Sequence, residues 1–183
     1  MSGRHEAEKR GDMEDSGEYG PLEWAEPIHG ALVVVSRDQA ASFVGYERGS
    51  GLPGRVVVEG VVSVWESGGA SVLVLHSPDE WACTGCTTTD GAVLIVTHLG
   101  GVGSADLLQA ARDLSADAFQ DTGEEFRVGT EGLAIFDGTA SWDMVEQGLH
   151  VSGDAPAGTY RLQFAAECKT AAGRLRLLRL QRC

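Results

Sequence analysis

Two short apolar runs stand in the middle of the chain, residues 72–75 (VLVL) and residues 92–96 (AVLIV). Ser-Pro-Asp follows the first run closely and Thr-Asp-Gly precedes the second, so each run is flanked by residues that favour turns. Runs of this length that are rich in Val and Ile predict β-strands. Neither run alternates with polar residues, which indicates strands near the middle of a sheet with both faces covered. Between them we expect a polar loop that carries Trp81, Cys83 and Cys86.

The same criteria predict strands elsewhere in the chain, at residues 31–35, 55–65, 126–128, 133–136, 149–151, 159–165 and 175–180. In the second of these, Glu59-Gly60 implies a bulge or a tight reversal. In the last, the apolar positions change phase between Leu177 and Leu178, and a bulge there would restore one buried face. Asp154 to Tyr160 contains Pro and Gly and predicts a tight corner between strands.

Two helices are predicted. Ser36 followed by Gln39 resembles a capping box, and a short helix is expected at residues 37–44. A longer helix is expected after Ser104, which is a suitable N-cap. Its apolar residues recur at helical spacing and form one stripe that should pack on a sheet, namely Leu107, Leu108, Ala111 and Leu114.

These elements predict an α+β fold that is rich in β-strands, with a mixed or antiparallel sheet and one or two short helices. Residues 1–20 are polar, acidic and without periodicity, so a disordered tail is expected there. Residues 21–183 should form a single domain with two possible parts, residues 21–122 and 123–183. The second part should form a layer like that of a β-sandwich, continuous with the first.

The charge balance restricts the partners. The chain has 27 acidic and 14 basic side chains and a net charge of −13. Such a charge repels a phosphate backbone, so no nucleic acid is expected as a partner, whereas a basic protein would be attracted. The alternative is that the charge only maintains solubility.

No apolar run approaches the ~20 residues that span a bilayer, and the N-terminal residues lack the apolar segment of a secretory signal. A cytoplasmic location without membrane contact is therefore expected.

Cys83-Thr84-Gly85-Cys86 is the one close pair of cysteines. A Cys-x-x-Cys segment can form a redox dithiol, but the residues that follow it predict a turn rather than the helix that activates such a thiol. It can also supply half of a zinc site, for which only distant ligands such as His76, His98 or Cys168 are available. The third interpretation, two small thiols in a turn, is preferred. No catalytic, cofactor-binding or metal-binding residue is therefore assigned.

The order of segments is also informative. Trp24 precedes a strand with the sequence ALVVV, and FVGYER follows the first helix. ASVLVLHSPDEWACTG, GAVLIVTHLG, GLAIFDG, APAGTYRLQF and LRLLRL then come in that order. This succession resembles the immunity protein 21 family of bacterial polymorphic toxin systems. The family has a Tyr-Arg-x-Cys-like segment where this chain has Tyr46-Glu47-Arg48 without the Cys. The resemblance implies a non-enzymatic protein that binds and neutralises a cognate toxin domain, without a cofactor.

A candidate contact surface for such a partner is the loop at residues 77–90. Asp79, Glu80 and Asp90 are acidic, and Trp81 is an aromatic residue of the kind that anchors interfaces, although Trp81 could equally belong to the core. Two other functions remain open. One is a dithiol or metal-dependent enzyme that uses Cys83 and Cys86, and the other is a small β-rich module that binds a ligand or another protein.

Overall fold

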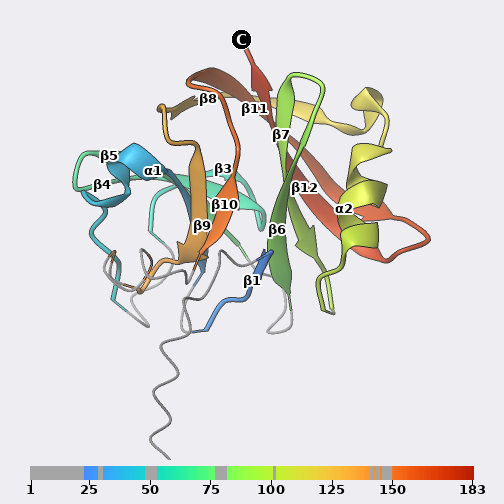
Figure 1. Ribbon diagram of the computed structural model, residues 1–183, viewed down its shortest axis with the longest axis horizontal. Coiled ribbons are helices and arrows are strands. Elements are labelled where there is room, and N and C mark those ends of the chain that lie inside the picture. Colours follow the sequence, from blue (N-terminus) through green and yellow to red (C-terminus); the bar gives the residue numbers. More distant parts are fainter. Residues whose placement is uncertain are drawn as a thin grey trace, which may run out of the picture.

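The computed structural model describes residues 23–28, 31–47, 53–76, 82–100, 102–140, 142, 145 and 150–183. The predicted tail at residues 1–20 and three of the predicted contact residues, Asp79, Glu80 and Trp81, lie outside these ranges. The described chain forms two six-stranded sheets that pack on each other, together with two short α-helices and a 3-10 turn, η1 (Ala116–Ala118) (Figure 1). The protein therefore has a β-rich α+β fold, as predicted.

Both sheets take strands from early and late parts of the chain. The first sheet has the order β10 (Val151–Gly153), β9 (Leu133–Asp137), β2 (Leu32–Ser36), β5 (Ala70–Leu75), β4 (Val62–Ser67), β3 (Arg55–Val58). The second has the order β1 (Trp24–Ala25), β6 (Cys83–Thr89), β7 (Ala92–His98), β12 (Arg174–Arg182), β11 (Gly158–Lys169), β8 (Gln120–Val128). Every strand pair among the described residues is antiparallel, which decides between the mixed and antiparallel sheets that the sequence allowed.

The main core lies between the two sheets. Leu73 and Ile135 enter it from the first sheet, and Ile95, Leu162 and Leu178 enter it from the second. All five side chains are buried, and burying a side chain of this size stabilises a fold by about 1.5–3 kcal/mol. Interdigitated apolar side chains between two sheets are what hold a β-sandwich together.

The outer face of each sheet is covered as well. On the first sheet, α1 (Arg37–Ala40) leads to Phe43, whose ring packs edge-on against Phe136 with 5.4 Å between the ring centroids. On the second sheet, α2 (Ala105–Arg112) buries Leu107 and Ala111 against the strands. The predicted apolar stripe on this helix is thereby confirmed. α1 begins at Arg37, as predicted, but ends at Ala40 instead of residue 44. The predicted capping box is absent, because the Ser36 hydroxyl bonds to Asp38 and accepts from the Gly129 N–H.

These outer layers explain the two uninterrupted apolar runs. Residues 72–75 belong to β5 and residues 92–96 to β7, and each strand has neighbours on both sides, as predicted. They are not partners, however, because β5 forms a hairpin with β4 and β7 forms one with β6. The expectation of a polar loop around Cys83 and Cys86 is therefore wrong, since Cys83–Thr89 is a strand. Four β-branched threonines favour an extended chain there even without large apolar residues.

The predicted bulge at Leu177 and Leu178 is also wrong. β12 pairs with β7 without a break from Leu175 opposite His98 to Gln181 opposite Ala92. The apolar phase changes because Leu175 and Leu177 pack under α2, whereas Leu178 and Leu180 face the core between the sheets. The register shift in this hairpin lies in β11 instead, between Ala165 and Cys168.

The two sheets approach each other along two lines at their sides. β3 of the first sheet approaches β8 of the second, and we name this line the β3–β8 seam; β10 and β6 approach each other along the β6–β10 seam. A β-carbon added to Gly153 in β10 would lie 2.8 Å from Cys86 Sγ in β6, so the two strands are in close contact there. Among the described residues, no helix is long and apolar enough to cross a membrane.

Candidate binding site

A cavity of about 570 Å³ opens at one end of the sandwich, where the turns after β6, β8 and β10 come together with the end of β12. The C-terminus marks this end of the molecule (Figure 1). The lining residues come from four separate segments of the chain, namely Thr88, Thr89, Gly91, Ala92, Val93, Thr130, Glu131, Gly132, Asp154, Ala155, Pro156, Tyr160 and Arg182. A volume of this size is typical of sites that bind small molecules or inserted side chains.

The apolar part of the lining is rigidly held. Ala92, Val93 and Ala155 are buried, and the ring of Tyr160 is only 1 % exposed. The Tyr160 hydroxyl donates a hydrogen bond of 2.6 Å to the Pro156 carbonyl oxygen, which ties β11 to the corner that precedes it. Burial raises the pKa of this phenol, while the nearby charge of Arg182 opposes that effect. The sequence predicted this corner correctly.

The polar side chains of the lining are three hydroxyls that can donate or accept, two carboxylates that accept and one guanidinium that donates. Within the described ranges, no hydrogen bond or ion pair joins the hydroxyls of Thr88, Thr89 and Thr130 or the carboxylates of Glu131 and Asp154 to another described residue. The one cationic group of the lining is Arg182. Nη2 of its guanidinium donates to the Ala157 carbonyl oxygen at 3.0 Å, which leaves the positive charge and the other N–H donors of the group in place.

Asp154 also acts on the β6–β10 seam. Burial raises the pKa of the Cys86 thiol to about 12, and the negative charge of Asp154 contributes in the same direction. The carboxylate therefore lies close enough to the seam for its charge to act on a side chain within the seam. No basic side chain compensates this charge with an ion pair in the described parts of the chain.

Of the predicted contact residues, Asp90 is the one that the structure describes. It is exposed at the tip of the turn between β6 and β7, directly before Gly91, which lines the cavity. The sequence did not predict that Glu131, Asp154 and Arg182 share a site. No local pattern could have done so, because these residues share the site only through the meeting of turns that are distant in the sequence.

The structure separates Cys83 and Cys86. They are three residues apart on an extended strand, so their side chains point to opposite faces of the sheet. Cys86 packs against the core between the sheets, and burial raises the pKa of the Cys83 thiol to about 11, with a further contribution from the charge of Glu26. Both effects disfavour the thiolate that redox chemistry and zinc binding require. In the described part of the chain, no three His, Cys, Asp or Glu side chains are placed to hold a metal ion.

One Ser–His contact was not anticipated. The Ser63 hydroxyl and His76 Nε2 are 2.7 Å apart, as in a nucleophile and its base. Ser63 is buried, however, and the adjacent cavity has a volume of about 10 Å³, enough for no more than about one water molecule. Burial, assisted by the charge of Arg176, lowers the pKa of His76. This contact satisfies two polar groups at a strand end rather than forming a site that a substrate could enter.

The chain matches no family model, no curated protein and no solved structure.

Proposed function

We propose that this chain is an immunity protein of the cytoplasm that binds and neutralises a cognate polymorphic toxin domain. The observation that supports this function best is the acidic, turn-lined end of the sandwich. Asp90, Glu131 and Asp154 lie on three turns around or beside one cavity, and the net charge of the chain is −13. The resemblance of the sequence to the immunity protein 21 family points to the same function.

The acidic charge suits an inhibitor that must reach its target quickly. Across the described residues, exposed acidic side chains outnumber exposed basic ones. A field of one sign steers a basic partner into contact and raises the association rate, and salt weakens this effect. The same field disfavours nucleic acid as a partner.

Co-expression tests the proposal directly. The toxin domain encoded beside this gene is expressed in a bacterial host with and without this chain, and growth is measured. We expect growth to be restored and a complex to be recovered by size-exclusion chromatography. We also expect the association rate to fall as the salt concentration rises. Full toxicity in the presence of the folded chain, with no complex detected, would contradict the proposal.

The cavity itself favours a second candidate function, a module that binds a small ligand. Its volume and its mixture of buried apolar residues with a few polar groups are those of a ligand site. A screen of small cations, sugars and nucleosides by thermal unfolding distinguishes this function from the first. A ligand that raises the unfolding temperature, together with no effect on toxin activity, would favour the ligand-binding module over the immunity protein.

A further inference from the structure

We propose that residues 23–28 form a strap that opens as a unit while the two sheets stay folded, with the indole ring of Trp24 as its latch. The strap contains β1, which lies beside the start of β6 at the end of the molecule away from the C-terminus (Figure 1). Opening of the strap uncovers the edge of β6 at Thr84 and Gly85. This inference does not rest on the proposed function, because it concerns the fold of this chain alone.

The backbone of the strap is held at its two ends. At one end, β1 pairs with β6 through two residues, Trp24 and Ala25. At the other end, the Ile28 N–H donates to Asp137 Oδ2 at 2.8 Å, which ties the strap to the first sheet. The side chain of Ile28 is 71 % exposed and adds little packing there. Since a two-residue ladder forms few main-chain hydrogen bonds, the backbone alone holds the strap weakly on the second sheet.

The side chain of Trp24 provides most of the packing of the strap. Its indole ring lies against Gly85 of β6 and Gly103 of the segment before α2, and it packs on the apolar cluster under α2. A β-carbon at Gly103 would lie 2.0 Å from Cδ2 of the ring, and one at Gly85 would lie 3.0 Å from the same atom. Ala25 is also buried, but it is small. Because aromatic rings dominate packing energies, this one ring decides whether the strap is closed.

The closed strap leaves a polar group of its latch unsatisfied. Trp24 Nε1 is buried and has no hydrogen-bond partner in the described part of the chain. A buried N–H without an acceptor costs free energy, and this cost disappears when the indole meets water. The favourable packing of the ring is therefore opposed by the desolvation of its N–H, which brings the closed and open states of the strap closer in free energy.

The sheets do not need the strap for their own pairing. β6 pairs with β7 along all of its residues, from Cys83 to Thr89. The hydroxyls of Thr84 and Thr97 are 3.0 Å apart and link the same two strands. Opening of the strap removes β1 from the edge of the second sheet and leaves β6, β7, β12, β11 and β8 paired. A strand edge that is uncovered in this way can receive an extended segment of another chain.

Hydrogen exchange of the complete chain, followed by NMR, tests the inference. The Trp24 indole N–H and the Ile28 backbone N–H report on the two ends of the strap, and the backbone N–H groups of β7 report on the sheets. Trp24→Phe identifies the indole signal among the four tryptophans. We expect both strap protons to exchange with one opening free energy and to be protected at least about a hundredfold less than the β7 amides. Low urea should accelerate exchange of the β7 amides but hardly that of the strap protons, because strap opening exposes little surface.

Gly103→Ala removes the room for the latch without straining the backbone, because φ of Gly103 is not positive. The three atoms nearest to the added methyl group all belong to Trp24. We nevertheless expect the Trp24 indole and the Ile28 amide to lose their protection together, while the β7 amides keep theirs. The matched control is Gly158→Ala in β11, whose β-carbon would lie 3.2 Å from Nε at the end of the flexible Arg182 side chain. Both strap protons should keep their protection in this control.

Exchange of the Trp24 indole with the same free energy and urea dependence as the β7 amides would overturn the inference, since the strap would then open only with the sheets. Different opening free energies for the Trp24 indole and the Ile28 amide would also overturn it, as would protection of Ile28 that survives Gly103→Ala, because the strap would not open as a unit. If Gly103→Ala does not fold, the measurements on the unmodified chain decide the matter. The co-expression experiment is independent of these results, so the strap and the proposed function can fail separately.

Discussion

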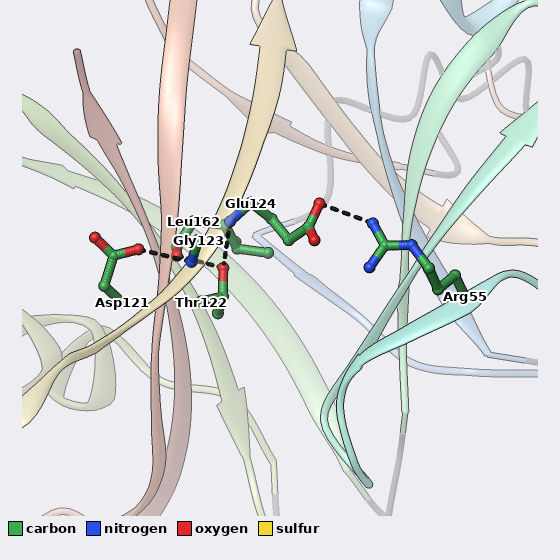
Figure 2. Close-up of polar contacts among 6 residues, drawn as sticks. All are labelled: Arg55, Asp121, Thr122, Gly123, Glu124 and Leu162. Atoms are coloured by element: carbon green, nitrogen blue, oxygen red, sulfur yellow. Dashed lines mark hydrogen bonds and ion pairs between the residues drawn. The ribbon is translucent and has the colours of Figure 1, made fainter.

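The two seams of the sandwich are closed in different ways. Along the β3–β8 seam, Arg55 Nη2 donates to Glu124 Oε2 at 2.8 Å and links the two sheets (Figure 2). β8 bulges at residues 122–124, because Arg161 pairs with Glu125 and Gln163 pairs with Asp121. Along the β6–β10 seam, the strands touch through Gly153 and Cys86, and the turns beyond them leave the cavity open.

The seams also differ in how their polar groups are satisfied. In the bulge of β8, the Thr122 hydroxyl donates to the Leu162 carbonyl oxygen, and the Asp121 carboxylate accepts from the Gly123 N–H (Figure 2). A bulge with bonded side chains protects an edge strand from pairing with another chain. At the end of the β6–β10 seam, the carboxylates of Glu131 and Asp154 are exposed to solvent and form no ion pair with another described residue.

Alkylation of cysteines gives the largest expected effect and reports on the packing of the β6–β10 seam. With a pKa of about 12 instead of 9.0, Cys86 has a thiolate fraction about a thousandfold lower at pH 8. The greater nucleophilicity of a high-pKa thiolate recovers part of this loss. We therefore expect iodoacetamide to modify Cys86 more than about tenfold more slowly than the exposed Cys183. Mass spectrometry of peptides measures both rates.

In guanidinium chloride all four cysteines should react at similar rates, which controls for the intrinsic chemistry of each site. Rapid labelling of Cys83 and Cys86 together in the native protein would mean that β6 is not the strand described and that a dithiol function must be reconsidered.

Two glycines with nearly the same backbone conformation compare the packing beside the cavity with that in the β8 bulge. Gly132 lies at the cavity with φ +76° and Gly123 lies in the β8 bulge with φ +77°. A β-carbon at Gly132 would lie 2.5 Å from the Gly153 carbonyl oxygen, whereas one at Gly123 meets nothing within 4 Å. We expect Gly132→Ala to lower the free energy of unfolding by about 3 kcal/mol and Gly123→Ala by about 1 kcal/mol. Urea unfolding measures both, and equal costs would contradict the close packing of the turn before β9 against the end of β10 beside the cavity.

A smaller effect is expected from removing one side-chain hydroxyl beside the cavity and one in the β8 bulge. Tyr160→Phe removes the bond to the Pro156 carbonyl oxygen, whereas Thr122→Val removes the bond to the Leu162 carbonyl oxygen and the bond that the hydroxyl accepts from the Glu124 N–H. Since the usual net contribution of such a bond is about 1 kcal/mol, Tyr160→Phe should lose about 1 kcal/mol of unfolding free energy and Thr122→Val about 1–2 kcal/mol. Melting curves of the two variants give the comparison. No loss in Tyr160→Phe would show that the corner beside the cavity is held by packing alone.

The strands of this fold were largely predictable, because most of them are apolar runs bounded by turn residues. The errors share one physical cause. The sequence pattern reports how polar the two faces of a strand are, but not which layer covers each face. The phase change in β12 is an example, since Leu177 packs under α2 and Leu178 faces the other sheet. The pairing of β5 with β4 instead of β7 was likewise not encoded in the local pattern.

The candidate site was less predictable than the fold. Asp90 was identified because an acidic residue in a turn is visible in the sequence. Glu131 and Asp154 are equally acidic and also lie in turns, but nothing local distinguishes them from solvated residues elsewhere. They become a site only because the turns after β8 and β10 meet the turn after β6. That proximity depends on the order of strands in both sheets, which periodicity alone does not determine.

The smallest expected effect concerns the ion pair of the β3–β8 seam. The hydrogen bond from Arg55 lowers the pKa of the Glu124 carboxyl below its ordinary value of 4.5. Glu124 therefore contributes stability above the pKa of the unfolded chain, and this contribution is lost as the pH falls through the lower, folded value. We expect Arg55→Ala to raise the pKa of Glu124 towards 4.5, measured by NMR titration of the carboxyl carbon. Since Arg55 is exposed, the global stability should hardly change, and salt should weaken the shift. A large loss of stability in Arg55→Ala would mean that the β3–β8 seam depends on this ion pair, and that the contrast with the packed β6–β10 seam is wrong.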